Sequence, residues 1–168
     1  MINGSMSDIM IREIREEEIY KLEDMLYESI YQPDKQNLVP RSVLQIPAVY
    51  AYIDNFGKLE DDYCLVACSA EEIIGAVWVR ILSEEVKGFG NVDSETPEFA
   101  ISLLEGYRNR GIGTELMRRM IGYLKKRGYK QTSLSVSKGN YAVKLYRKVG
   151  FEIVEENSDD YIMLLELN

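Results

Sequence analysis

The chain has 168 residues, 46% of them hydrophobic and 29% charged, with a net charge of −8 at neutral pH. This mixture is typical of one globular domain that buries its own core, and it excludes a disordered chain. The absence of histidine excludes Ser-His and Cys-His nucleophiles and histidine-ligated zinc, and no apolar run reaches the roughly 18 residues of a membrane span.

The predicted elements alternate between strands and helices and contain no internal repeat. Alternating apolar residues indicate strands, and apolar residues every three to four positions indicate helices. In chain order the sequence predicts a strand over 9–14, a helix over 16–31, a helical stretch over 41–56, a hairpin of 62–69 and 72–82, a strand over 97–104, a helix from 112, a strand over 131–137, a short helix over 140–149, and strands over 151–155 and 161–167. Because hairpins occur both mid-chain and at the end, we expect an α/β fold whose mixed sheet has helices on both faces.

Residues 1–8 precede the first predicted strand and are treated as a tail, with residues 9–168 as a single domain. The tail lacks the basic and apolar regions of a secretory signal, and its Gly-Ser-Met sequence is typical of a cloning remnant. Cys64 and Cys68 lie in one predicted strand, about 13 Å apart at the usual rise per residue, which is too far for a disulfide. Two reduced thiols suggest a cytoplasmic protein.

Basic residues are concentrated in one segment of an acidic chain. Residues 108–148 hold twelve basic residues and one acid, so this segment carries +11 and the remainder carries −19. A local basic block suggests a phosphate-bearing ligand, whereas basic residues on one helix also form an ordinary solvated face. Charge alone leaves both explanations open.

A glycine-rich turn follows the strand predicted over 97–104. It reads Arg108-Asn109-Arg110-Gly111-Ile112-Gly113-Thr114 and opens an amphipathic helix. The first N–H groups of a helix have no partner inside the helix, and glycines let an anion approach them closely. The turn is therefore suited to a pyrophosphate, although it is neither a Walker loop nor a dinucleotide fingerprint. An ordinary tight turn remains the alternative.

These residues resemble the acetyl-CoA pyrophosphate loop, Arg-x-x-Gly-x-Gly, of the GNAT superfamily of N-acetyltransferases. A second segment, 140–151, resembles that family's Asn…Ala…Leu-Tyr…Gly-Phe motif and follows at the expected place. The resemblance covers residues 9–167 and implies a mixed, mostly antiparallel sheet with acetyl-CoA as co-substrate. It also implies that the cofactor is bound by Leu103, Leu104, Glu105, Arg108, Asn109, Arg110, Gly111, Ile112, Gly113, Thr114 and Asn140. Two positions depart from the common pattern: Asn140 lies two residues before Ala142 rather than three, and Glu105 stands where many members have proline.

The same resemblance implies roles for individual residues in moving an acetyl group to a primary amine by direct attack. Tyr146 corresponds to the general acid that protonates the departing thiolate, and its ordinary pKa of about 10 keeps it protonated at neutral pH. The backbone N–H of Leu103 is a candidate donor to the thioester carbonyl. Glu98 is the candidate base for the acceptor ammonium, with a solvated loop carboxylate as the alternative; Asp93 and Glu95 lie just upstream.

Two other classes of function remain as alternatives. One is a catalytically silent, acyl-CoA-binding regulatory module of the same fold. The other is a nucleic-acid-binding domain that uses the basic segment, although the isoelectric point of about 4.7 argues against it. We expect a small-molecule or peptide amine as acceptor, no nucleic acid, membrane or metal partner, and a monomer or homodimer. Acidic residues at 60–62, 84–85, 93, 95 and 98 suggest a cationic or polar acceptor, unless they serve solubility alone.

Overall fold

A computed structural model describes residues 8–82 and 86–168 of the chain. Within these residues, seven strands form one sheet in the order β1-β2-β3-β4-β5-β7-β6. The elements are β1 (Ile9–Glu13), η2 (Glu16–Lys21), α1 (Leu22–Ser29), η3 (Arg41–Gln45), α2 (Pro47–Tyr50), β2 (Tyr63–Ser69), β3 (Glu72–Arg80), β4 (Glu98–Leu103), η4 (Glu105–Tyr107), α3 (Ile112–Lys126), β5 (Gln131–Ser137), α4 (Ala142–Val149), β6 (Glu152–Glu156) and β7 (Asp160–Glu166), where η marks a 3₁₀ helix.

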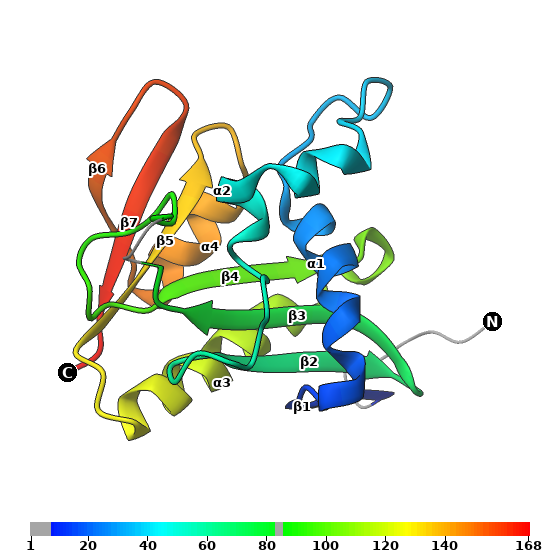
Figure 1. Cartoon of the computed structure of the whole chain (residues 1–168), viewed down its shortest axis with the longest axis horizontal. Helices are drawn as coiled ribbons and strands as arrows, with labels where there is room; N and C mark the ends of the chain where they lie inside the picture. The colour runs from blue at the N-terminus through cyan, green and yellow to red at the C-terminus, as the bar shows by residue number, and fades with distance from the viewer. Residues whose placement is uncertain (1–7, 83–85) are drawn as a thin grey trace.

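The sheet separates two hydrophobic cores, one on each face. Helices α1 and α2 lie on one face and α3 and α4 on the other (Figure 1). Side chains alternate along each strand, so Val77 and Val79 of β3 join the core under α3 while Trp78 joins the core under α1. The expected α/β fold with a mixed, mostly antiparallel sheet and helices on both faces is confirmed.

The sheet opens at its one parallel pairing. Among the described residues, β4 and β5 pair only at Glu98 and Ser133, while every other neighbouring pair of strands is antiparallel. Beyond that position the two strands diverge towards their carboxyl ends (Figure 1). The rest of β4 is hydrogen-bonded to β3 alone, so one edge of its backbone faces the space towards β5.

The largest error in the predicted elements is the helical stretch over 41–56. The structure has a 3₁₀ turn, an extended Ile46, the single α-helical turn of α2, and then turns as far as Gly57. Proline disfavours the helical conformation of the residue before it, and Ile46 precedes Pro47, so the helix is interrupted there. The helix predicted over 16–31 likewise begins as the 3₁₀ helix η2 and ends at Ser29.

The second half of the chain follows the prediction closely. Helix α3 ends just before Gly128, whose φ of 86° is the left-handed conformation expected after a helix C-terminus. Strand β5 has the predicted bounds, and α4 begins two residues later than predicted, at Ala142. No helix among the described residues is long and apolar enough to cross a membrane.

Candidate active site

The amino end of α3 has the backbone geometry that the glycine-rich turn predicts. Gly111 is the N-cap, with a φ of 82° that a side chain would strain, and its carbonyl accepts the first hydrogen bond of the helix from Glu115 N–H at 3.1 Å. The N–H groups of Ile112, Gly113 and Thr114 therefore precede the first bond within the helix. A Cβ added at Gly113 would meet no atom within 4 Å, so the space beside this backbone is open.

The side chains around this turn are already tied to neighbouring elements. Arg108 donates from Nε to the carbonyl of Leu103 at 3.0 Å and lies 3.8 Å from Glu28 of α1. Arg110 lies over the Tyr107 ring, and Glu105 forms an ion pair with Lys35. The loop residue Asn109 has a positive φ of 62°.

The basic segment does not form one patch. Arg118 and Arg119 both bind Glu115, which holds the pKa of that carboxyl down at about 2. Lys125 and Lys126 lie at the opposite end of α3, about 20 Å from Gly111 at 1.5 Å per residue. Among the basic residues of the segment 108–148, Arg108 and Arg110 are the two that lie next to the amino end of α3. Most of the +11 therefore belongs to solvated helix surface.

The backbone of β4 distinguishes Leu103 from Leu104. Leu104 N–H donates to the carbonyl of Ile74 on β3 at 2.9 Å, so that group is already used. Hydrogen-bonded and non-hydrogen-bonded pairs alternate along antiparallel strands, and Leu103 pairs with Gly75 at the next position. The N–H of Leu103 therefore points away from β3, into the space between β4 and β5.

Tyr146 lies in the core on the α3 and α4 face of the sheet. It is 9% exposed, and its ring meets that of Phe151 edge-on at 5.9 Å between centroids. Burial raises the pKa of its phenol to about 12.

Glu98 is the first residue of β4 and projects from the opposite face, where α1 and α2 lie. It is 3% exposed, so the alternative that it is a solvated loop carboxylate is wrong. Its Oε2 accepts hydrogen bonds from the Tyr52 hydroxyl and from Gly90 N–H at 3.2 Å, while the buried Oε1 has no partner among the described residues. Burial raises the pKa of this carboxyl, and the two hydrogen bonds oppose that rise.

Sequence patterns did not reveal the residues that enclose Glu98. Tyr52 is one of twelve tyrosines, and its position inside the mispredicted 41–56 stretch gave no signal. Gly88 and Gly90 lie between the strands predicted to end at 82 and to begin at 97, outside every predicted element. A Cβ at Gly88 would nevertheless lie 1.9 Å from Glu98 Oε1, and one at Gly90 would lie 2.7 Å from the backbone of β5. The signal available was the Gly-x-Gly spacing, which permits such close contacts.

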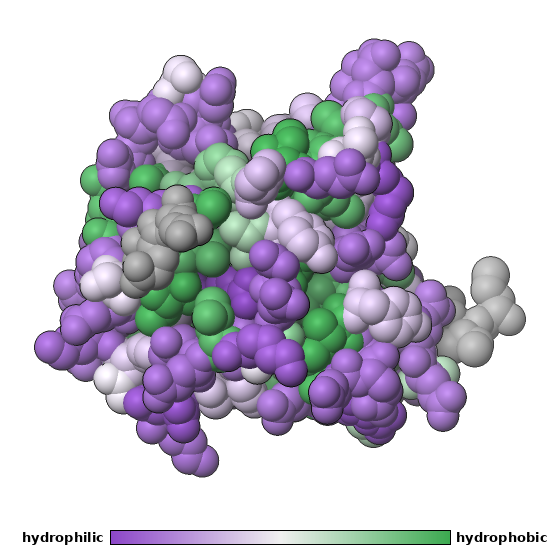
Figure 2. Space-filling model, viewed as in Figure 1, coloured by the Kyte–Doolittle hydropathy of each residue, from purple (hydrophilic) through white to green (hydrophobic). Residues whose placement is uncertain are grey.

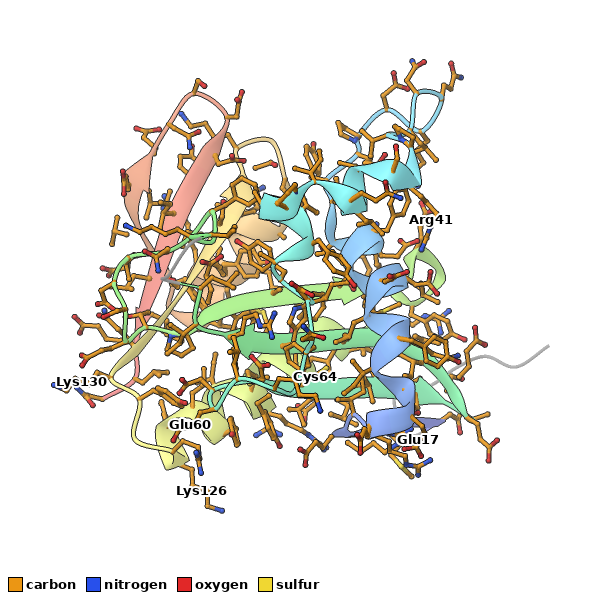
Figure 3. The ribbon with its side chains drawn as sticks, in the orientation of Figure 1. Glu17, Arg41, Glu60, Cys64, Lys126 and Lys130 are labelled. Carbon is orange, nitrogen blue, oxygen red and sulfur yellow. The ribbon has the colours of Figure 1, made fainter. Side chains whose placement is uncertain are left out.

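The remaining candidate residues do not gather around Glu98. The side chain of Asn140 accepts from Ala142 N–H at 2.9 Å and so starts α4. Asp93 caps the backbone of Glu95 and Thr96, which lowers the pKa of its carboxyl. Acidic residues at 60–62 lie near the carboxyl end of α3, since the hydroxyl of Tyr129, just after that helix, donates to Asp61 (Figure 3). Those at 84 and 85 fall outside the described residues.

The described residues hold no cluster of metal ligands, and a surface pocket lies away from the candidate residues. No group of three or more histidine, cysteine or acidic side chains in the described ranges could hold a metal ion. One surface pocket of about 420 Å³ is lined by Glu23, Arg41, Ser42, Leu44, Gln45 and Tyr50, none of which is a candidate residue. Cys64 and Cys68 are both buried and free, as their spacing predicts.

Comparison with known proteins finds acetyltransferases, both by a family profile and by pairwise sequence similarity. A sequence profile described as the acetyltransferase (GNAT) family matches residues 17–151. Mycothiol acetyltransferase of Corynebacterium glutamicum is 30% identical over 99 residues, which cover 58% of this chain but 31% of that protein, so this chain spans about a third of its relative's length.

Solved structures share the fold over nearly the whole chain. A GNAT-family acetyltransferase from Staphylococcus aureus superposes with a TM-score of 0.70 at 18% identity and covers 95% of this chain and 99% of its own. PaiA N-acetyltransferase from Thermoplasma acidophilum, solved with coenzyme A, has a TM-score of 0.63 at 21% identity and covers 94% and 98%. The diverging β4 and β5, the open amino end of α3 and the profile match over most of the chain lead to one conclusion: this chain belongs to the GNAT family of acetyltransferases.

Proposed function

We propose that the chain is an acetyl-CoA-dependent N-acetyltransferase that acts on a primary amine by direct attack. The observation that carries this proposal is the divergence of β4 and β5 immediately after Glu98. It leaves a backbone N–H of β4 on the side where β4 has no paired strand, close in sequence to the N–H groups at the amino end of α3 that precede the first helical hydrogen bond. A thioester with a long pyrophosphate-bearing tail matches this combination of donors.

The chain's own groups fit the anionic part of acetyl-CoA. The N–H groups of Ile112, Gly113 and Thr114 are oriented as helix-terminal donors for a pyrophosphate. Gly113 leaves room for the close approach of the phosphates. Arg108 and Arg110 add positive charge at the same end, at the cost of loosening the contact between Arg108 and Glu28. GNAT enzymes use acetyl-CoA, and the residues present here fit it.

The two proposed catalytic side chains project from opposite faces of the sheet. Glu98, on the α1 and α2 face, would take a proton from the acceptor ammonium so that the nitrogen lone pair can attack. Leu103 N–H would stabilise the negative charge on the thioester oxygen as the C–N bond forms. Tyr146, on the α3 and α4 face, would then donate its proton to the sulfur as the C–S bond breaks. The second proton that the nitrogen loses on becoming an amide would restore the phenol by way of solvent. The acceptor and the leaving thiolate are thus served from different sides of β4.

Acidic residues of the β6 and β7 hairpin are better candidates to attract the acceptor than those of the segment 60–62. The segment 60–62 lies at the far end of α3, and Asp62 there is neutralised by Arg80. The hairpin of β6 and β7 instead carries six acidic and no basic residues over 152–166, and its tip forms one of two hydrophilic projections with hydrophobic surface between them (Figure 2). This distribution supports a cationic or polar amine, whether small molecule or peptide. Reduced Cys64 and Cys68 support a cytoplasmic location.

A screen of amines with acetyl-CoA, read by the release of free thiol, tests the proposal. We expect turnover with at least one cationic amine and a loss of about 10²-fold or more in kcat when Glu98 is replaced by Gln. Binding of acetyl-CoA without thiol release for any amine would instead favour the silent acyl-CoA-binding module.

A further inference from the structure

The hydroxyl of Tyr52, in the turns that follow α2, hydrogen-bonds to Glu98, the proposed base. It donates a hydrogen bond to Oε2 of Glu98 and accepts one from Phe89 N–H at 2.8 Å. Because a lone pair of the tyrosine oxygen is engaged by Phe89, its own proton is directed at the carboxylate. Gly90 N–H donates to the same carboxylate oxygen at 3.2 Å, so both donors converge on Oε2 and leave Oε1 without a donor among the described residues.

The position of Tyr52 is fixed from β3. Trp78 donates from Nε1 to the carbonyl of Tyr52 at 3.1 Å, and Arg80 donates from Nη1 to the carbonyls of Ala51 and Asp54, at 2.8 Å each. The ring of Tyr52 also stacks on that of Phe89, 6.2 Å between centroids and 11° between planes. A 3₁₀ turn and a single α-helical turn would not hold a side chain in place by themselves, so these contacts define where the hydroxyl lies.

Arg80, a cation close to Glu98, is bound by another carboxylate, that of Asp62. Arg80 is the residue of β3 directly opposite Glu98, and both side chains project from the same face of the sheet. Its guanidinium is nonetheless bound through Nε and Nη2 to both carboxylate oxygens of Asp62, at 3.0 and 2.8 Å. From β5, the adjacent Ser133 hydroxyl donates to the carbonyl of Gly90. Tyr52 and the Gly90 N–H are therefore the groups that bind the carboxylate.

We propose that Tyr52 is a positioning residue for Glu98: its hydroxyl orients the carboxylate by binding Oε2, favours the ionised form of the carboxyl and leaves Oε1 without a donor from the described part of the chain. The inference rests on the proposed role of Glu98 as base and adds a residue from the 41–56 segment to that role. An isolated buried carboxyl would hold its proton and could accept no other. A neutral donor that binds the charged form opposes this effect without introducing the positive charge that would quench the base.

Direct titration of the Glu98 carboxyl tests the coupling without using activity. In the full chain labelled with ¹³C-glutamate, the Glu98 carboxyl resonance is identified by its loss in Glu98→Gln, and its titration is compared between wild type and Tyr52→Phe. The phenylalanine keeps the ring stack on Phe89 and removes only the donor, so we expect the pKa of Glu98 to rise by about one unit. Tyr129→Phe is the matched control, because Tyr129 also donates to a carboxylate, that of Asp61, and it should leave Glu98 unchanged.

The pH dependence of kcat/KM connects the coupling to the reaction. In Tyr52→Phe the acidic limb of the profile should move up by the same amount, so that activity lost at neutral pH returns at higher pH, which a defect in packing alone would not do. The double variant Tyr52→Phe, Glu98→Gln should be no slower than Glu98→Gln. An unchanged Glu98 titration in folded Tyr52→Phe overturns the inference, even if Glu98→Gln removes the acidic limb. A shifted titration with an acidic limb that survives Glu98→Gln supports the coupling and overturns Glu98 as the base.

Discussion

Tyr146 has two properties that suit the proposed proton donor. Its ring is packed in the core against Phe151, and its phenol, which is protonated at neutral pH even at its ordinary pKa, has that pKa raised by burial to about 12. In the proposed mechanism Glu98 has the opposite task, because it would accept a proton although burial raises the pKa of its carboxyl. The hydrogen bonds from Tyr52 and Gly90 oppose that rise.

Replacing Tyr146 with phenylalanine should preserve packing and delete the proton. We expect kcat to fall by about 10²–10⁴, the usual effect of losing a general acid, with little change in coenzyme A affinity. Steady-state kinetics with the best amine and calorimetry with coenzyme A measure the two quantities. Tyr129→Phe serves as the control, and a kcat equal to wild type would leave Tyr146 with a structural role only.

The buried carboxyl of Glu98 should make the stability of the protein depend on pH in a defined direction. Its pKa in the folded state is raised above that of the unfolded chain, so the folded state holds the proton more tightly. Stability relative to Glu98→Gln should be highest below about pH 4 and should fall as pH rises through the unfolded and then the folded pKa. Urea unfolding of both proteins between acid and neutral pH measures the difference, and a difference that grows with pH would contradict the prediction.

At the scale of elements, short and weak segments are positioned by a few strong contacts. The segment from η3 to β2 contains one 3₁₀ turn and one α-helical turn, yet it carries Tyr52 and Asp62. Arg80 of β3 binds two of its carbonyls and the carboxylate of Asp62, and its guanidinium lies over the Phe56 ring at 5.2 Å. Helix α3, by contrast, is long and capped by Gly111, so its amino end is fixed by its own backbone.

The Arg80–Asp62 pair is buried, with side chains 3% and 0% exposed. Replacing Asp62 with asparagine would leave the arginine charge in a place with little solvent. We expect a loss of about 3–5 kcal/mol in the free energy of unfolding, measured by urea denaturation. Asp24→Asn, which breaks the exposed pair with Arg41, should cost less than about 1 kcal/mol. Equal effects of the two substitutions would show that burial of the Arg80 pair is unimportant.

The amino end of α3 should lose its affinity for coenzyme A when a negative side chain is placed there. Gly113→Asp adds that charge in open space, so the fold should persist while coenzyme A binding weakens at least about tenfold in calorimetry. Gly122→Asp makes the same change further along α3, also in open space, and should bind coenzyme A normally. Unchanged affinity in Gly113→Asp would remove the phosphate site from this helix end.

At the scale of the molecule, the basic and acidic parts are distributed over different elements. Twelve of the 20 basic residues lie in the segment 108–148, which contains α3 and α4, whereas the β6 and β7 hairpin and the first half of the chain are acidic. A negative field concentrates cationic amines and weakens as ionic strength rises. The whole molecule can therefore favour one class of acceptor even where no single acid contacts it.

With acetyl-CoA saturating, kcat/KM for a cationic amine should fall as salt is added. An uncharged amine measured in the same series should show a much smaller change, because screening acts on the charged acceptor. Kinetics at several salt concentrations provide the comparison. A best acceptor that carries net negative charge would contradict the inference from charge.

The sequence by itself determined the order of elements and the glycine-rich turn at Gly111 and Gly113, because periodicity and turn chemistry are local properties of the chain. Tyr146 stood out among the twelve tyrosines only through the resemblance of 140–151 to a family motif. The sequence did not determine that 41–56 would break at Pro47, that Leu103 rather than Leu104 would present a free N–H, or that Glu98 would be buried against Tyr52 and Gly90. These were decided by the tertiary structure, since strand pairing selects which backbone groups remain available. The approach of residues 46 apart in sequence, such as Tyr52 and Glu98, depends on how the two cores pack and on no local pattern.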